Sequence, residues 1–279
     1  MSNLEILTAS PTGLCFGVQR AIKTLEQELK NGTVYAIGSP IHNPQETHRL
    51  EKLGLIVVET PSEVPQGAVC FIRAHGITPQ MQTELEAKNA RIVDGTCPFV
   101  KNAQEKAKKL SQNGYSVVIL GDVSHPEIVG INGYAGNAAT VLTTDDEVPK
   151  ELFGKRIGFL SQTTQRVEDF CTMAAKLTAR SQELCIFNTV CKATLERQQA
   201  VQVLTKKTDG VIVLGGRNSA NTRKLVEISS SRVSTIWIEH ADELDKTWLE
   251  DKHTIGIAAG GSTPDWLIQN LILTLHKSS

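Results

Sequence analysis

Short apolar runs recur along the whole chain, separated by longer amphipathic stretches. The apolar runs are bounded by glycine, proline or polar residues, which is typical of buried strands. The predicted strands lie at 34–38, 68–72, 116–120, 157–160, 211–214, 235–238 and 254–258.

The stretches between these runs have the spacing of helices. Ala103, Ala107 and Leu110, for example, form one apolar stripe of a predicted helix. The predicted helices lie at 18–30, 80–88, 101–113, 167–180, 195–207, 223–229 and 265–276. Strands that alternate with helices predict an α/β fold with parallel sheets covered by helices.

Three cysteines stand at equivalent places in this alternation. Cys15, Cys97 and Cys191 each follow a short apolar run and precede a stretch that predicts a helix. They divide the chain into parts of similar length, which suggests three α/β units that each deliver one cysteine to a common centre. The expected lobes are 13–96, 97–191, and 192–279 together with 1–12.

Composition narrows the class of protein. The chain is 40% hydrophobic and 21% charged, as is usual for a soluble globular protein, and its formal net charge is −1, so no strong positive field favours nucleic acid or an anionic membrane. The longest apolar runs, such as 210–215, are far too short to span a bilayer. The N-terminus lacks the basic and apolar segments of a signal peptide, so we expect a cytoplasmic protein.

The same three cysteines are candidates for a metal centre. At a helix N-terminus, backbone N–H groups and the helix dipole favour the thiolate form of cysteine. Three thiolates from three turns could bind one soft metal centre and leave a coordination position free, as a catalytic metal requires. Taken without their neighbours, however, they could equally be structural.

The other three cysteines have different surroundings. Cys70 and Cys185 lie within apolar runs, and Cys171 lies within a predicted amphipathic helix. A cysteine inside such an element is usually a small residue of the hydrophobic core. Six cysteines in a cytoplasmic chain argue against a disulfide framework.

Three of the seven histidines stand at predicted strand ends, beside small or turn-forming residues. These are His42, His75 and His125. Because ligands of open α/β sheets bind beyond the carboxyl ends of the strands, the three suggest a common pocket for an anion. We expect the remaining histidines to lie at or near the surface; these are His48, His240, His253 and His276.

Further polar residues add to this pocket. Glu127 follows His125 by two positions and could deliver protons, although a carboxylate favoured by a helix dipole would look the same. The glycine-rich segments 215–222 and 260–265 follow strands and open helices, an arrangement that suits phosphate binding. A third polar turn lies at 161–164, whereas a dinucleotide fingerprint, a Walker loop and a nucleophile elbow are all missing from the sequence.

Together these motifs resemble those of the LytB family, the 4-hydroxy-3-methylbut-2-enyl diphosphate reductases. The resemblance covers nearly the whole chain, from about Cys15 to Leu267. The matching motifs are, in order, Gly13-x-Cys15-x-Gly17-Val18-x-Arg20-Ala21, His42-Asn43-Pro44, Ala74-His75-Gly76, Thr96-Cys97-Pro98, His125-Pro126-Glu127, Ser161-Gln162-Thr163-Thr164, Cys191-x-Ala193-Thr194 with Arg197-Gln198, Asn218-Ser219-x-Asn221, and Gly260-x-Ser262-Thr263-Pro264-Asp265.

The resemblance implies a fold and a set of residue roles. Three similar α/β lobes would stand in a pseudo-threefold arrangement around a central [4Fe–4S] cluster with three cysteine ligands and one open iron. The implied ligands of the cluster are Cys15, Cys97 and Cys191, and Glu127, Thr163 and His125 match the catalytic residues. The residues that match the substrate-binding set are His42, His75, His125, Thr163, Ser219, Asn221 and Ser262.

The implied activity is reductive dehydroxylation of (E)-4-hydroxy-3-methylbut-2-enyl diphosphate to isopentenyl and dimethylallyl diphosphate, with a ferredoxin or flavodoxin as electron donor. The chain departs from the family pattern at Phe16, Glu46 and Ala220, and it has Gly95 and Gly261 where alanines are usual. Three alternatives stay open: a paralogue that dehydroxylates a different anionic alcohol, a non-enzymatic iron–sulfur or zinc regulatory protein, and a ligand-binding α/β protein with structural cysteines.

Overall fold

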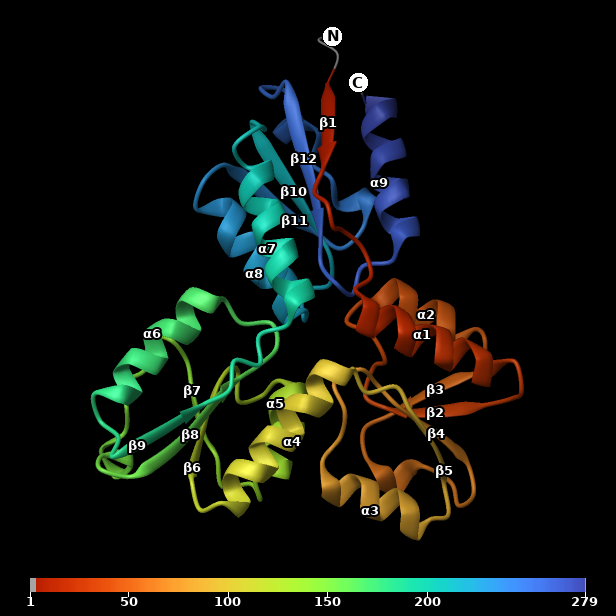
Figure 1. Cartoon of the computed structure of the whole chain (residues 1–279). Coiled ribbons are helices and arrows are strands. Elements are labelled where there is room, and N and C mark those ends of the chain that lie inside the picture. Colours follow the sequence, from red (N-terminus) through yellow and green to blue (C-terminus); the bar gives the residue numbers. More distant parts are fainter. Residues whose placement is uncertain (1–3, 279) are drawn as a thin grey trace. The chain divides into compact units, whose positions relative to one another are not determined.

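The computed structural model describes residues 4–278 and contains three four-stranded sheets (Figure 1). All neighbouring strands run parallel. Helices connect successive strands, as parallel pairing requires. The α/β class with three lobes, expected from the sequence, is therefore confirmed.

The first sheet along the chain has the order β3-β2-β4-β5. Its strands are β2 (Val34–Ile37), β3 (Leu55–Val58), β4 (Val69–Ile72) and β5 (Arg91–Asp94). The helices of this part of the chain are α1 (Phe16–Leu29), α2 (Pro44–Glu51) and α3 (Pro79–Ala87).

The second sheet has the order β7-β6-β8-β9. Its strands are β6 (Ser116–Leu120), β7 (Thr140–Leu142), β8 (Arg156–Ser161) and β9 (Glu183–Ile186). The accompanying helices are α4 (Pro98–Gln112), α5 (Pro126–Tyr134) and α6 (Val167–Thr178).

The third sheet combines the start of the chain with its end, in the order β1-β12-β10-β11. Its strands are β1 (Glu5–Thr8), β10 (Gly210–Leu214), β11 (Ser234–Ile238) and β12 (Thr254–Ala259). Its helices are α7 (Lys192–Leu204), α8 (Ala220–Ser230) and α9 (Asp265–Ser278). Short 3₁₀ helices lie at Pro61–Glu63, Lys150–Leu152, Ala241–Glu243 and Lys246–Leu249.

Both faces of the central strands are buried, which explains why these strands read as continuous apolar runs. In β6, Val117 and Ile119 pack in one core cluster with α4, while Val118 and Leu120 pack in another with α6. The strand β10 repeats this alternation: Val211 and Val213 belong to one cluster, and Ile212 and Leu214 to the other.

Every predicted strand and helix is present, but five strands and two helices were missed. The missed strands are β1, β3, β5, β7 and β9, and each of them is at the edge of its sheet. Edge strands bury less of their surface than central strands; in β1 and β9, for example, the terminal residues are exposed. Their sequences therefore contain shorter apolar runs, which are harder to recognise. The missed helices α2 and α5 are short and begin at a proline that follows a histidine motif.

Contacts along the chain divide it into two compact units. The first unit comprises Met1–Gln19, Ile41–Arg49 and Lys192–Ser279, and the second comprises Arg20–Pro40 and Leu50–Cys191. The first therefore contains the third sheet, and the second contains the other two. The lobe boundaries expected at 13–96, 97–191 and 192–279 with 1–12 stay a prediction. Within residues 4–278, none of the helices combines the length and the apolar character needed to cross a membrane.

A steric reason explains why position 95 has glycine where the family usually has alanine. A Cβ at this position would lie 2.5 Å from the ring of Phe71 and 2.6 Å from the carbonyl oxygen of Ile72, both of which are buried. We expect Gly95→Ala to lower the free energy of unfolding by about 1–3 kcal/mol, because strand β4 or the Phe71 ring must shift. Urea denaturation would measure this, and an unchanged midpoint would show that the site has room for a methyl group.

Candidate active site

In the first unit, the turn that carries Cys15 is tied down on both sides. The Cys15 N–H donates to the carbonyl oxygen of Gly261 at 2.9 Å, and the buried guanidinium of Arg197 donates from Nη2 to the carbonyl oxygen of Gly13 at 2.9 Å. Gly13 has a φ of +79°, and a side chain there would overlap the carboxylate of Asp265. The turn that places Cys15 at the start of α1 is thus held by α7 and by the turn that contains Gly261. Phe16, which follows it, is 63% exposed.

The polar turns of the first unit contact one another. Ser219 is the N-cap residue of α8, where its Oγ accepts from the Thr222 N–H at 3.2 Å. The hydroxyl of Ser262 lies 3.3 Å from that same Oγ. Gly216 opens this turn, and a side chain there would overlap the carbonyl oxygen of His42. The structure therefore brings His42, Ser219 and Ser262 onto three adjoining turns.

Asn221 adds an amide to this group. It lies in the first turn of α8, and its Oδ1 is buried without a hydrogen-bond partner among the described residues. A Cβ on Gly261 would lie 3.6 Å from its Nδ2 and 3.4 Å from the Sγ of Cys15. Because a buried polar group without a partner is costly, the Asn221 amide is available to a ligand. Ala220, which precedes it, offers no hydroxyl.

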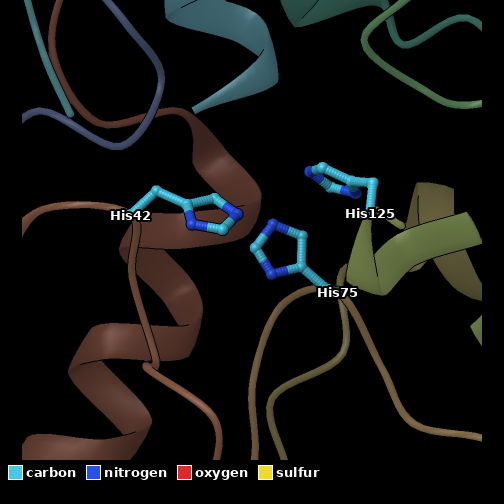
Figure 2. Close-up of side chains that lie close together, drawn as sticks. All are labelled: His42, His75 and His125. Carbon is cyan, nitrogen blue, oxygen red and sulfur yellow. The ribbon is translucent and has the colours of Figure 1, made fainter. Parts of the chain in front are cut away.

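In the second unit, the imidazoles of His75 and His125 lie against one another, and Figure 2 shows the two rings side by side. Their centroids are 5.3 Å apart, with the ring planes 88° from parallel. His125 is the N-cap residue of α5, and its Nδ1 accepts from the Glu127 N–H at 3.2 Å. In the neutral ring the proton therefore resides on Nε2, which becomes a hydrogen-bond donor.

Glu127 lies in the first turn of α5 and is almost completely buried. Its Oε1 accepts from the Thr163 N–H at 2.6 Å, and its Oε2 accepts from the Thr163 hydroxyl at 2.9 Å. Burial raises the pKa of Glu127 from 4.5 to about 7, and the two hydrogen bonds from Thr163 offset only part of this effect. A carboxyl group with this pKa can donate a proton near neutral pH. The alternative of a helix-dipole carboxylate alone does not account for its burial.

Cys97 and Cys191 are hydrogen-bonded through their backbone to the turns that carry His75 and Thr163, respectively. The Cys97 N–H donates to the carbonyl oxygen of Ala74, beside His75, at 3.0 Å, and Cys97 begins α4 as its N-cap residue. The Cys191 N–H donates to the carbonyl oxygen of Thr163 at 2.9 Å, directly before α7. The backbone therefore fixes Cys97 beside the turn of His75 and Cys191 beside the turn of Thr163.

These cysteines fit a soft metal centre. Cys15, Cys97 and Cys191 are half-buried at helix starts, and none of the six cysteines, all within the described residues, forms a disulfide. Thiolates are the ligands that iron–sulfur clusters require. Cys70 differs, because burial raises the pKa of its thiol to about 11 and so keeps it protonated.

One expectation about the remaining cysteines was wrong. Cys171 is exposed on α6 rather than buried in the core, because it lies on the face of that helix opposite Phe170 and Met173. Cys185 is half-buried and packs against the core cluster around α4 and β6. Cys70 is fully buried, as expected.

The sequence analysis also missed two residues that shape the site. Arg197 was noted only as part of a motif, yet its guanidinium holds the Gly13 turn. A charged residue on a buried face of a helix is the sequence signal that could have indicated this role. Trp266 was not considered at all. Its indole donates to Glu46, a contact between distant segments that no local pattern predicts.

Comparison with known proteins identifies the family. The family model described as "LytB protein" matches residues 6–276. The chain belongs to this family. This LytB chain is 41% identical over 279 residues to the 4-hydroxy-3-methylbut-2-enyl diphosphate reductase of Sulfurimonas denitrificans, covering 99% of the chain and 100% of the relative. It is 39% identical to the enzyme of that name from Aquifex aeolicus, covering 96% and 94% respectively.

Solved structures resemble the LytB chain as well. The E-1-hydroxy-2-methyl-but-2-enyl-4-diphosphate reductase from Plasmodium falciparum matches it with a TM-score of 0.90 at 28% identity, covering 98% of this chain and 88% of that one. A second structure, described as (E)-4-hydroxy-3-methyl-but-2-enyl diphosphate reductase, the terminal enzyme of the non-mevalonate pathway, has a TM-score of 0.71 at 37% identity and covers 99% of this chain and all of its own.

Proposed function

We propose that the chain is a 4-hydroxy-3-methylbut-2-enyl diphosphate reductase, which removes the hydroxyl of (E)-4-hydroxy-3-methylbut-2-enyl diphosphate to give isopentenyl and dimethylallyl diphosphate. The observation that carries the proposal is the buried Glu127, with a pKa of about 7, held by Thr163 beside the His75–His125 pair. Relatives with this activity in their names cover the full length of the chain. A cytoplasmic location, expected from the sequence, is part of the proposal.

The residues that match the family's substrate-binding set would bind the diphosphate. His42, Ser219, Asn221 and Ser262 offer ring, hydroxyl and amide donors, and His75 and His125 offer imidazole donors. The N–H groups at the start of α8 add the positive end of a helix dipole. Hydrogen bonds from such donors to charged phosphate oxygens are about twice as strong as those between neutral groups.

Cys15, Cys97 and Cys191 would hold a [4Fe–4S] cluster that has one iron without a cysteine ligand. When bound, the cluster supplies electrons one at a time and a Lewis-acidic iron near the substrate alcohol. The thiols suit this role because each is anchored through its backbone N–H or by its place at a helix start. We propose a ferredoxin or flavodoxin as the external electron donor.

Glu127 and Thr163 would handle the proton. Loss of the hydroxyl as water and reduction of the carbon skeleton together consume two electrons and two protons. With a pKa of about 7, Glu127 keeps its proton in a large fraction of molecules at neutral pH, and the Thr163 hydroxyl donates to its Oε2 at 2.9 Å, so the pair can pass a proton to the departing oxygen. Exclusion of water around the buried carboxyl keeps this proton for the substrate.

An anaerobic assay tests the proposal. The protein, reconstituted with iron and sulfide, is mixed with a reduced dye as electron donor and with 4-hydroxy-3-methylbut-2-enyl diphosphate, and the five-carbon diphosphates are quantified. We expect turnover. No turnover by a protein whose spectra show an intact four-iron cluster would contradict the proposed substrate and would point to a different anionic alcohol.

A further inference from the structure

Glu46 is a buried carboxylate close in sequence to His42, one of the residues that we assign to the diphosphate. It is 3% exposed and lies in the first turn of α2, four residues after His42. Its two oxygens accept hydrogen bonds from Arg49, at 3.0 Å from Nε and 2.6 Å from Nη2. Oε2 also accepts from the indole Nε1 of Trp266 at 3.1 Å. All of these residues belong to the first unit.

The bond to Trp266 joins two turns that carry candidate ligands of the diphosphate. On one side, Asn43 caps α2, and its Oδ1 accepts from the Glu46 N–H at 2.9 Å, so Glu46 is fixed relative to the segment that begins at His42. On the other side, Trp266 is the second residue of α9 and follows the turn that contains Ser262. A shift of α2 relative to α9 would therefore change the distance between His42 and Ser262.

The ion pair with Arg49 explains how a carboxylate is tolerated here. An unpaired negative charge beside a diphosphate would repel it and would be costly to bury. The guanidinium of Arg49 neutralises Glu46 through two hydrogen bonds, which leaves Oε2 to accept from Trp266 as well. Glu46 thus acts as a bridge inside the protein rather than as a charge presented to the ligand.

We propose that Glu46 is a positioning residue: through Trp266 it sets the spacing of the His42 and Ser262 turns and hence the affinity for the diphosphate. The inference rests on the proposed function. Two other contacts already join these turns, between Gly216 and His42 and between Ser262 and Ser219. The hydrogen bond between Glu46 and Trp266 adds a third contact, which joins α2 to α9. None of these contacts involves Glu127 or Thr163, so we expect the proton step to be unchanged.

Three variants distinguish the effect of the Trp266–Glu46 hydrogen bond from the effect of the negative charge on Glu46. Trp266→Phe keeps an aromatic ring and removes the N–H donor, Glu46→Leu introduces an apolar residue, and Glu46→Gln keeps an acceptor for the indole. We expect the first two to raise KM for the diphosphate substrate about 5- to 10-fold, the equivalent of one hydrogen bond, with kcat within about twofold of the parent. Glu46→Gln should restore most of the affinity.

Trp248→Phe is the matched control. The Trp248 indole also donates one hydrogen bond, to the Ser234 hydroxyl at 2.9 Å, but it lies in a 3₁₀ helix that carries none of the candidate ligands. This variant should leave KM unchanged. The double variant Glu46→Leu/Trp266→Phe should be no weaker than either single variant, because both remove the same bond.

Titration calorimetry with inorganic pyrophosphate tests the inference without turnover. Its affinity should fall in parallel with the rise in KM, and the indole N–H resonance of Trp266, assigned from its loss in Trp266→Phe, should shift in Glu46→Leu and stay near its place in Glu46→Gln. Unchanged pyrophosphate affinity in a folded Trp266→Phe variant would overturn the inference. If the parent binds pyrophosphate but does not turn over the substrate, the proposed function fails, and the same titration still decides the role of Glu46.

Discussion

Glu127→Gln is expected to lower turnover of the isoprenoid substrate by roughly 10²–10⁴-fold, the usual contribution of a general acid. The amide has the shape of the carboxyl group and can still accept from the Thr163 N–H, so the site keeps its geometry. It cannot give up a proton at neutral pH. Single-substrate kinetics, with the visible absorbance of the cluster as a check on the metal centre, would measure the effect.

The matched control is Glu105→Gln, which alters an exposed carboxylate on α4. Turnover by this variant should equal that of the parent. If Glu127→Gln retained full turnover with an intact cluster, the proton would have to come from another group, and the role assigned to the Glu127–Thr163 pair would be wrong.

The pH dependence follows from the same pKa. Since the folded protein holds the Glu127 proton up to a pH of about 7, kcat should fall as the pH rises through this value and the acid loses its proton. In Glu127→Gln this fall should disappear from the residual activity. A parent profile that is flat from about pH 6 to about pH 8, roughly one unit on either side of the pKa, would contradict the assignment.

Stability should also fall as the pH rises, over a window that begins below the one in which activity falls. Between pH 4.5 and about 7 the folded state binds the Glu127 proton and the unfolded state does not, so the free energy of unfolding falls as the pH rises through this window, by about 3 kcal/mol in all. Glu127→Gln removes this cost. We therefore expect the variant to be more stable than the parent at pH values above about 7 and to differ less below 5.

Replacement of any one of Cys15, Cys97 and Cys191 by serine is expected to abolish the cluster and with it all measurable turnover, because the cluster supplies the electrons. Each thiol stands at a helix start that other backbone segments hold in place, so a neighbouring residue cannot take over its role. Iron and sulfide analysis after anaerobic reconstitution would measure the loss.

Cys171→Ser is the control for these variants. Cys171 is exposed on α6, so its replacement should preserve the iron content, the turnover and the stability. If a Cys15, Cys97 or Cys191 variant retained four irons, that cysteine would not be a ligand. Zinc in place of iron and sulfide in the parent protein would instead favour the regulatory alternative.

The sequence by itself determined the fold class, because periodicity and turn residues are local signals. The runs of β6 and β10 are apolar throughout since both of their faces are buried, and this alone marks them as central strands of parallel sheets. The places of Cys97 and Cys191 at helix starts were also readable, since the adjacent residues open α4 and α7. The motifs, in their order along the chain, were also sufficient to indicate the LytB family.

Only the tertiary structure decided how these residues work together. Burial raises the pKa of Glu127 to about 7 and so makes it an acid, while Thr163, 36 positions away, holds the carboxyl through two hydrogen bonds that offset part of this rise. In the sequence Glu46 is only a departure from the family pattern, whereas in the structure Arg49 neutralises it and Trp266, 220 positions away, donates a hydrogen bond to it. The exposure of Cys171 depended on which face of α6 meets the core. Burial and long-range contacts arise only when the chain is packed, and for that reason no local pattern contains them.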